Sequence, residues 1–407
     1  MNILNFTNFI LITIFSCCFF GCKKNSHLNH IPENHIGNEE YVISIIPPKD
    51  FNQFDLTPYL DSVKYVVLEL TDESLIGSID KIVIYEERIY ILDTKTHSLF
   101  VFDMDGAYIH KIARVGQGPG DYTQIDFFDI DIKKKQIVLT DLMSYWVMRY
   151  DLDGKFLFKQ KIPVWCYGVS ILPNSGIVLY ADFRNNSEKL AQEYNLIYLD
   201  STMNYKKAYF PYNSKDFNQE IKPPASIGGQ FFALDEFLNF TFPGGNTVYQ
   251  ITEDSLINRY QFNFGNDILP IENPTNPSQF TEQLRRKYNG FLTSVMENEE
   301  VLFFTMQTNI DLPLRFGYTV YYSKKSRNML SAYLFMIEKF NINFPRTCYD
   351  SWIVSVMESY SLIEWKEKYP KEQISFAGSY TKARLDLAKE LTDDDNPVLM
   401  FVKLKDF

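Results

Sequence analysis

The most distinctive short segment of the chain is the glycine-rich loop RVGQGPGDY, from Arg114 to Tyr122. Three glycines and one proline within five residues fix a sharp backbone path, and their N–H groups could bind an anion or a sugar ring. The ligand-binding candidates are the polar side chains of this loop: Arg114, Gln117, Asp121 and Tyr122. The alternative is a rigid crossover between two sheets, which also needs Gly and Pro and is the simpler interpretation. The loop lacks the GK[ST] signature of a phosphate loop.

Paired aspartates precede a glycine at Asp103/Asp105 and again at Asp151/Asp153. This spacing suggests calcium, but an EF-hand loop needs a Glu six residues after its Gly. Ile112 and Gln160 occupy those positions, so we interpret both pairs as hairpin turns.

Other carboxylates could carry acid–base or metal chemistry. Asp129 and Asp131 lie on one face of an expected strand, as an acid–base pair or as a solvated edge, and we favour the edge. A metal-dependent hydrolase or lyase would need carboxylates that converge in a central channel. The candidates for that channel are Asp80, Asp126, Glu236 and Asp350.

Motifs of the common hydrolases are absent from the sequence, including GxSxG and HExxH. Of five histidines, only His97 and His110 follow the N-terminal segment, so a His-based triad is poorly supported. The sequence therefore identifies no catalytic residue, and we expect no cofactor, with a divalent metal in the channel as the alternative. Aromatic residues near strand ends could stack on sugars, although most should pack between strands: Trp146, Trp165, Tyr167 and Trp352.

Short runs of β-branched and aromatic residues, separated by turn residues, predict the elements that position these side chains. The first runs are Tyr65–Leu70, Lys81–Tyr85, Arg88–Asp93, Leu99–Asp103 and Tyr108–Ala113. The pattern recurs at an offset of 48 residues, which superposes Gly106 on Gly154. A four-stranded unit of about 45 residues cannot bury its faces alone, and such units stack around an axis as the blades of a propeller.

Further strands are expected at Phe231–Phe242, Asn246–Thr252, Tyr260–Phe264, Val301–Thr308, Arg315–Ser323 and Met329–Ile337. Helices are expected at Thr281–Met296 and Lys382–Leu391, as caps on one face of the ring. Because an open ring exposes strand edges, we expect closure by Val398–Leu404 pairing with the run Tyr65–Leu70.

The N-terminus predicts the compartment. Residues 1–21 carry no charge and contain an apolar stretch too short to span a membrane, followed by Gly21 and Cys22. This arrangement resembles a bacterial lipoprotein signal that is cut before an acylated Cys22; an uncleaved signal anchor is the alternative. We expect a signal peptide over 1–21, a flexible tether over 22–50 and one β-propeller domain over 51–407.

Three histidines of the tether, His27, His30 and His35, could hold a metal only if a helix aligned them, and Pro32 argues against that helix. In the folded body, Cys166 and Cys348 could form a disulfide or remain free thiols. With 40 Lys and Arg against 51 Asp and Glu, the formal net charge is −11, which argues against a nucleic-acid partner on electrostatic grounds.

Three segments resemble a known family. They are the run Asp55–Leu60 that leads to Tyr65–Gly77, the loop Gly116–Tyr122, and Asn396-Pro397-Val398 near the end. In this order they are similar to the six-bladed β-propeller lipoproteins of Bacteroidota-type bacteria, which themselves resemble NHL-type propellers. The resemblance implies an all-β chain with six blades, where the repeat length alone also allows seven. It implies no catalytic residue.

We therefore expect a noncatalytic binding or scaffold module that is held on the lipid bilayer through Cys22. Its partner would be a glycan, a peptide or an envelope protein, bound at a face lined by loops. The alternative is a metal-dependent, lactonase-like hydrolase or lyase that uses the central channel. Family analogy links surface display to acidic residues after the lipidated cysteine, and Lys23-Lys24-Asn25 has none, so we expect an outer-membrane lipoprotein that faces the periplasm.

Overall fold

The structure is a computed structural model that describes residues 36–45, 51–216, 231–234, 237–242, 245–263, 291–307, 317–342 and 344–407. The expected signal peptide, Cys22, the three tether histidines and Glu236 lie outside these residues.

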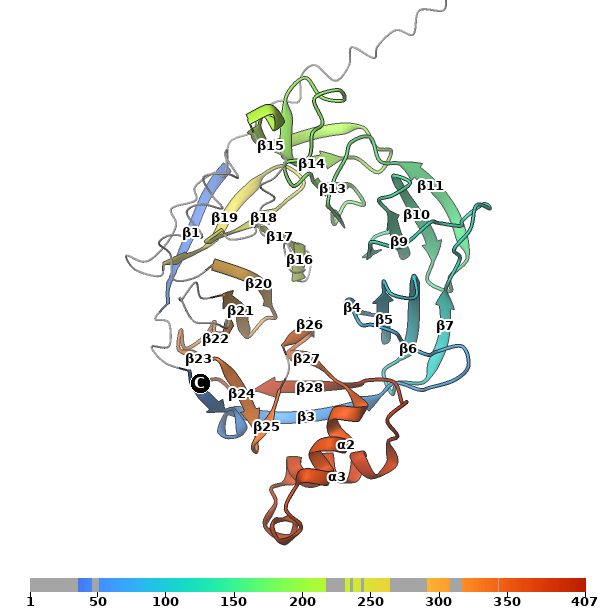
Figure 1. Ribbon diagram of the computed structural model, residues 1–407. Helices are drawn as coiled ribbons and strands as arrows, with labels where there is room; N and C mark the ends of the chain where they lie inside the picture. Colours follow the sequence, from blue (N-terminus) through green and yellow to red (C-terminus); the bar gives the residue numbers. More distant parts are fainter. Residues whose placement is uncertain are drawn as a thin grey trace, which may run out of the picture.

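The described strands form sheets arranged around a central axis (Figure 1). Turns occur where the sequence predicts them, and their backbone explains the residues used. Glu86 and Glu87 both have positive φ angles, 46° and 55°, as a two-residue hairpin of type I′ requires. Gly106 has a φ of 90°, and a Cβ atom there would lie 2.0 Å from the carbonyl oxygen of Val67. The predicted role of glycine in these turns is confirmed.

Three consecutive four-stranded sheets follow the repeat seen in the sequence. The first contains β4 Lys81–Tyr85, β5 Arg88–Asp93, β6 Ser98–Asp103 and β7 Tyr108–Ile112. The second contains β8 Phe127–Asp131, β9 Gln136–Asp141, β10 Trp146–Asp151 and β11 Phe156–Lys161. The third contains β12 Gly168–Ile171, β13 Ile177–Tyr180, β14 Glu193–Leu199 and β15 Tyr205–Tyr212.

The later sheets follow the same antiparallel plan. The fourth contains β16 Phe231–Leu234, β17 Phe237–Thr241, β18 Thr247–Ile251 and β19 Leu256–Asn263, with β1 Ile36–Ser44 added at its edge. The fifth contains β20 Phe291–Glu297, β21 Val301–Gln307, β22 Gly317–Ser323 and β23 Met329–Ala332. The closing sheet contains β26 Pro345–Tyr349, β27 Trp352–Met357, β28 Val398–Leu404 and β3 Leu60–Val67.

A seventh, three-stranded sheet lies between β23 and β28 (Figure 1). It contains β2 Gln53–Asp55, β24 Leu334–Ile337 and β25 Phe340–Asn341. The expected single strand Met329–Ile337 is broken at Tyr333, so that its second half pairs in parallel with β2. Counted by sheets, the propeller has seven blades, and the expected count of six is wrong. The count of six came from the family resemblance, whereas the repeat length also allowed seven; the small sheet itself was not expected, because β2 comes from the opposite end of the chain.

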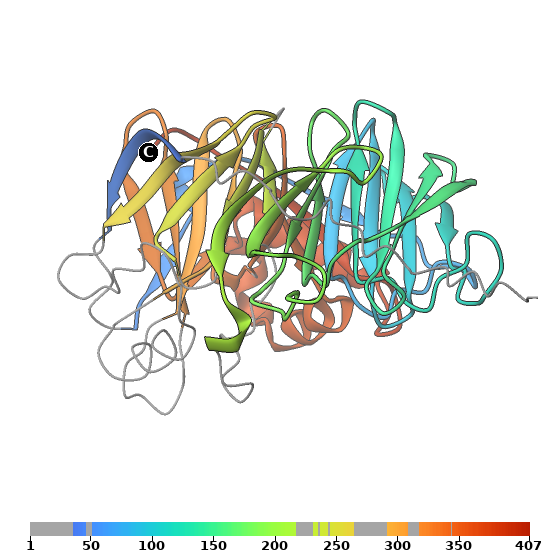
Figure 2. The ribbon, with the colours of Figure 1, turned by 90° about the horizontal axis from the view of Figure 1, so that it is seen from above.

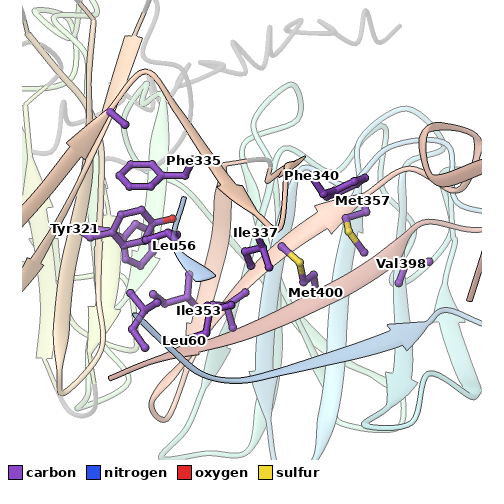
Figure 3. Packing of buried hydrophobic residues seen from close by; sticks show 14 of the residues in the cluster. Leu56, Leu60, Tyr321, Phe335, Ile337, Phe340, Ile353, Met357, Val398 and Met400 are labelled. Atoms are coloured by element: carbon purple, nitrogen blue, oxygen red, sulfur yellow. The ribbon is translucent and has the colours of Figure 1, made fainter. Parts of the chain in front are cut away.

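Closure of the ring by the two ends of the domain is confirmed. Strand β28 pairs with β27 on one side and with β3 on the other, and Met400 lies opposite both Ser355 and Tyr65. The core around this sheet also includes Phe335 and Ile337 of the small sheet (Figure 3). The closing sheet is therefore joined to the small sheet by hydrophobic contacts, in addition to the hydrogen bonds among its own strands.

Two α-helices, α2 Ser359–Lys368 and α3 Ser379–Glu390, connect β27 to β28 and lie beside the closing sheet (Figure 1). The second confirms the helix expected at Lys382–Leu391. Arg384 of α3 is fully buried, and its guanidinium donates a 2.8 Å hydrogen bond to the carbonyl of Ile337. This bond fastens the helices to the small sheet. Three short 3₁₀ helices are η2 Thr57–Tyr59, η3 Ser214–Asp216 and η5 Lys371–Phe376.

Two further expectations need correction. The C-terminal part of the expected tether is the strand β1, because Ile36–Ser44 can extend the exposed edge of β19 by parallel pairing. The helix expected at Thr281–Met296 overlaps β20, which pairs with β21; the earlier residues of that segment lie outside the described part. No helix in the described residues is long and apolar enough to cross a membrane.

Antiparallel order gives the ring two different faces (Figure 2). The hairpin face carries the turns between the first and second strands of each large sheet, and those between the third and fourth strands wherever these two are consecutive in the chain. The loop face carries the connections between the second and third strands and from one sheet to the next. The helices α2 and α3 belong to the loop face because they connect β27 to β28.

Because β28 closes the ring, removal of its buried side chains should destabilise the whole domain. We expect Leu399→Ala, at a fully buried position, to lower the free energy of unfolding by about 2–5 kcal/mol. Urea unfolding followed by circular dichroism measures this loss. Leu157→Ala, on the outer strand β11 where the side chain is 39% exposed, is the matched control and should change stability much less. Equal losses in the two variants would contradict the role of β28.

Candidate binding face

Aspartates at the ends of second strands organise the connections of the loop face. Asp93 accepts hydrogen bonds from the backbone N–H groups of Gly77, Lys95 and Thr96, at 2.7–3.0 Å. Asp141, 48 residues later, accepts the N–H groups of Thr123 and Ser144 at 2.7 and 2.8 Å. Burial raises the pKa of Asp93, but these hydrogen bonds outweigh it and hold the pKa below its ordinary value. The repeated carboxylates therefore fix loops.

The three described channel carboxylates proposed from the sequence, Asp80, Asp126 and Asp350, do not converge. Asp80 accepts the backbone N–H of Thr94, and Asp126 accepts that of Leu142, at equivalent places before β4 and β8. Burial raises the pKa of Asp126 above its ordinary value. Asp350 lies in the turn between β26 and β27, on the hairpin face, at the other end of an inner strand. These carboxylates cannot share one ligand at a single mouth of the ring.

The loop from Arg114 to Tyr122 satisfies its own backbone. The N–H of Gly118 donates to Asp121, the N–H of Gly116 donates to the carbonyl of Tyr122, and the N–H of Arg114 donates to the Tyr122 hydroxyl. The Arg114 guanidinium lies 3.3 Å from the Asp121 carboxylate. The structure thus brings Arg114, Asp121 and Tyr122 together and leaves Gln117 exposed.

Tyr122 is buried under this loop, and burial raises the pKa of its hydroxyl to about 12. Its hydroxyl oxygen lies 2.8 Å from the carbonyl oxygen of His97, and the hydroxyl of Tyr150 donates to the carbonyl of Gly120 at 2.7 Å. Such bonds fit a rigid crossover from β7 to β8. Because these hydrogen bonds keep N–H groups within the loop, they are not offered to a ligand. A binding role for the four loop residues stays a prediction.

The Asp129/Asp131 pair is not a solvated edge, as we had favoured. Asp131 is buried and forms a 2.6 Å ion pair with the buried Arg149. Asp129 lies 3.8 Å from the ammonium of Lys81 and accepts a 2.6 Å hydrogen bond from the Ser170 hydroxyl. Lys81, Asp129 and Ser170 thereby link the inner strands β4, β8 and β12. Both carboxylates have structural partners that strand alternation alone could not identify.

The Asp-x-Asp-Gly pairs are hairpin turns, as predicted. Asp103 accepts the N–H groups of Asp105 and Ala107, and Asp151 accepts the corresponding pair in the next sheet. Within the described ranges, no three or more His, Cys, Asp or Glu side chains gather closely enough to hold a metal ion. Cys166 and Cys348 are free thiols rather than a disulfide, and burial raises the pKa of Cys166 to about 12.

A group of lysines and aromatic rings lies on the loop face where the second and third sheets meet. We call it the lysine–aromatic cluster, and its members are Tyr145, Trp146, Lys161, Trp165 and Lys189. Tyr145 and Trp146 stand where β9 leads to β10, and Lys161 ends β11 opposite Trp146. Trp165 lies in the connection from β11 to β12, and Lys189 lies in the connection from β13 to β14. None of the five side chains is fully buried.

Sequence reasoning found only part of this cluster. Trp146 and Trp165 were candidates for sugar stacking because they lie near strand ends, and the structure places both on the loop face. Lys161 and Lys189 gave no signal, because they meet only when two sheets pack side by side. The expectation that most such aromatics pack between strands fits Trp352, whose ring contacts Phe401 at a centroid distance of 6.3 Å.

Comparison with known proteins supports the fold. The family model described as "Domain of unknown function (DUF4934)" matches residues 41–403. A "Putative exported protein" of Bacteroides fragilis NCTC 9343 has a similar structure, with 19% sequence identity and a TM-score of 0.67 over 90% of this chain and 100% of that chain. A member of the DUF4221 family from Bacteroides vulgatus ATCC 8482 is 10% identical, with a TM-score of 0.48 over 85% of this chain and 97% of that chain. The search of curated proteins found no match.

The bonds of Asp93 predict a pH-dependent loss of stability. We expect Asp93→Asn to lower the free energy of unfolding by about 1.5–3 kcal/mol at neutral pH, because charged hydrogen bonds are lost. Since the folded-state pKa lies below the ordinary value of 3.8, this contribution is complete above that pH and disappears as the pH falls through the folded-state pKa. The difference in free energy of unfolding between wild type and variant, measured by urea unfolding, should therefore be smaller at pH 3 than at pH 7.

Asp105→Asn is the control for this experiment, because its carboxylate is 91% exposed. The Asp105→Asn variant should have nearly the same free energy of unfolding as wild type at both pH values. If Asp93→Asn lowers the free energy of unfolding equally at pH 7 and pH 3, the loss of stability does not come from the charge of Asp93.

Proposed function

The chain belongs to the DUF4934 family, a domain of unknown function, and we propose that it is a noncatalytic binding propeller of the cell envelope. In this proposal Cys22 carries the lipid of an outer-membrane lipoprotein that faces the periplasm. The loop face binds a glycan, a peptide or an envelope protein. A ring suits this function because closure presents loops from many sheets around one axis.

One contrast on the loop face carries the proposal. The carboxylates at this face, Asp80, Asp93, Asp126 and Asp141, accept backbone hydrogen bonds that hold the loops. The ammonium groups of Lys161 and Lys189 lie over aromatic rings, and no ion pair with a carboxylate engages them in the described residues. These carboxylates are thus committed to structure, whereas the cations and rings of the cluster, which are partly exposed, can contact a ligand.

A hydrolase or lyase in the channel receives less support. Such chemistry needs several oxygen or nitrogen ligands around one metal ion, or an acid and a base beside one substrate. Asp80 and Asp126 lie at one end of the inner strands and Asp350 at the other. Asp129 is engaged by Lys81 and Ser170.

The proposed location rests on the N-terminal sequence, together with the name of the similar Bacteroides fragilis protein, which describes that protein as exported. We expect Cys22→Ser to move the protein from the membrane fraction to the soluble fraction, because acyl chains attached to that thiol would supply the membrane affinity. Fractionation and metabolic labelling with a fatty-acid analogue measure this change. Cys18→Ser, within the same N-terminal segment, is the matched control and should stay in the membrane fraction with its label. An unchanged membrane fraction for Cys22→Ser would exclude lipid anchoring.

Hydrogen–deuterium exchange tests where ligands bind. The mature chain is incubated with fractionated envelope glycans and peptides, and any retained component is purified and added back. We expect protection in the loop-face connections 142–146, 162–167 and 181–192, because these carry the cluster. The hairpin-face turns 132–135 and 172–176 should exchange as before. Protection confined to the hairpin face would reject the loop face as the binding surface.

A further inference from the structure

We propose that the lysine–aromatic cluster is a binding site for an acidic saccharide, in which Lys161 and Lys189 bind a sugar carboxylate and the aromatic rings contact the sugar. This inference rests on the proposed function and names the chemical class of its ligand.

The ammonium groups are held by several rings at once. The Nζ atom of Lys189 lies 5.1 Å from the ring centroid of Trp165 and 5.4 Å from that of Tyr145. The Nζ atom of Lys161 lies 4.5 Å from the ring centroid of Trp146 and 5.9 Å from that of Tyr145. Tyr145 is thus shared by both lysines, so two positive charges are gathered around one ring. Cation–π attraction explains why the two ammonium groups tolerate each other.

This concentration of charge is unusual for a chain whose net charge is −11. Lys159 also lies over Trp146, at 4.8 Å, and Arg184, from the same connection as Lys189, lies over Tyr167 at 6.0 Å. The exposed Glu188 is the carboxylate whose charge acts on Lys189, yet it forms no ion pair with it within the described residues. Partial burial, followed by repulsion from Lys161, lowers the pKa of Lys189. A bound anion would relieve this repulsion.

The hydrogen-bond donors of the cluster are largely free to serve a ligand. Lys161 donates one bond, at 2.5 Å, to the carbonyl of Ser144, which orients its ammonium. In the described part of the chain no hydrogen bond from the Lys189 ammonium accompanies its ring contacts. Each ammonium group can therefore donate charge-assisted hydrogen bonds to a ligand carboxylate beside the shared Tyr145 ring.

The aromatic rings favour an anionic sugar over an inorganic anion. A sugar presents apolar C–H faces that pack on indole and phenol rings, whereas inorganic anions gain nothing from such rings. Extended polyanions, such as nucleic acid or an anionic membrane, would meet the negative field of the rest of the protein. A short saccharide with a carboxylate uses both parts of the cluster and avoids that repulsion.

The probe is trigalacturonic acid, and the control ligand is its fully methyl-esterified form, which has the same rings without charge. Trp146 and Trp165 are two of the four tryptophans, so intrinsic fluorescence reports binding at the cluster. We expect saturable quenching by the acid, affinity at least about tenfold weaker for the ester, and weaker binding as ionic strength rises. Sodium sulfate at matched ionic strength should not reproduce the quenching.

The test variant is the double substitution Lys161→Met and Lys189→Met, which keeps the length of both stems and removes both charges. It should weaken binding of the acid by at least about tenfold. The matched control is Lys133→Met with Lys134→Met, two exposed lysines of the second sheet on the hairpin face, which should bind as wild type does. Circular dichroism melting of both variants confirms that they fold. Trp165→Ala should weaken acid and ester alike, because it removes a ring.

The acidic-saccharide inference is overturned if the acid fails to quench, if the ester or sulfate does so equally, or if the lysine variant binds normally. Exchange protection separates this failure from failure of the proposed function. Protection of 142–146, 162–167 or 181–192 by a neutral component would keep the binding function and reject the acidic class. Protection confined to the hairpin face would reject both.

Discussion

The pairing of β28 with β3 is the constraint on which the rest of the structure depends. Sheets arranged in a circle bury both faces only when the last sheet contacts the first, and an incomplete ring leaves strand edges exposed. Here one sheet takes three strands from the C-terminal part of the domain and one from its beginning, so the ends cannot separate without breaking a sheet. The positions of all loops around the axis follow from this closure.

Buried ion pairs add specificity to the packing between sheets. Asp131 of β8 receives the guanidinium of Arg149 and, at 2.8 Å, the hydroxyl of Ser175 from the following sheet. Glu297 of β20 receives Arg259 of the preceding sheet at 2.8 Å and Lys324 at 2.6 Å. Buried pairs of this kind contribute little net stability, but they penalise any arrangement that leaves one charge alone. The contacts that cross between sheets, from Ser175 to Asp131 and from Arg259 to Glu297, favour one order of neighbouring sheets and hence of their loops.

The sequence predicted what is local and repeated. Strands β4 and β5, the hairpins at Gly106 and Gly154, and the helix α3 follow from side-chain periodicity and turn chemistry that each segment carries by itself. Strand β1 and the small sheet of β2, β24 and β25 were not predicted, because parallel pairing between distant segments leaves no periodic signal.

In the candidate site, too, the sequence predicted local features but not contacts between distant residues. The glycine-rich loop was visible from its composition, but composition cannot reveal that its N–H groups bond to Asp121 and Tyr122 rather than to a ligand. The two tryptophans were visible as residues near strand ends. The two lysines that approach them come from different sheets, and only packing brings them together.

The direction of β1 has a consequence for how the molecule stands on a bilayer. Because β1 runs parallel to β19, Ile36 lies beside Leu256 at the hairpin face, and Ser44 lies beside Asn263 at the opposite end. About fourteen peptide units separate Cys22 from Ile36, a span of at most about 50 Å. An acyl anchor on Cys22 would thus join the ring from its hairpin side and leave the cluster, on the opposite face, accessible to a short saccharide in the aqueous phase.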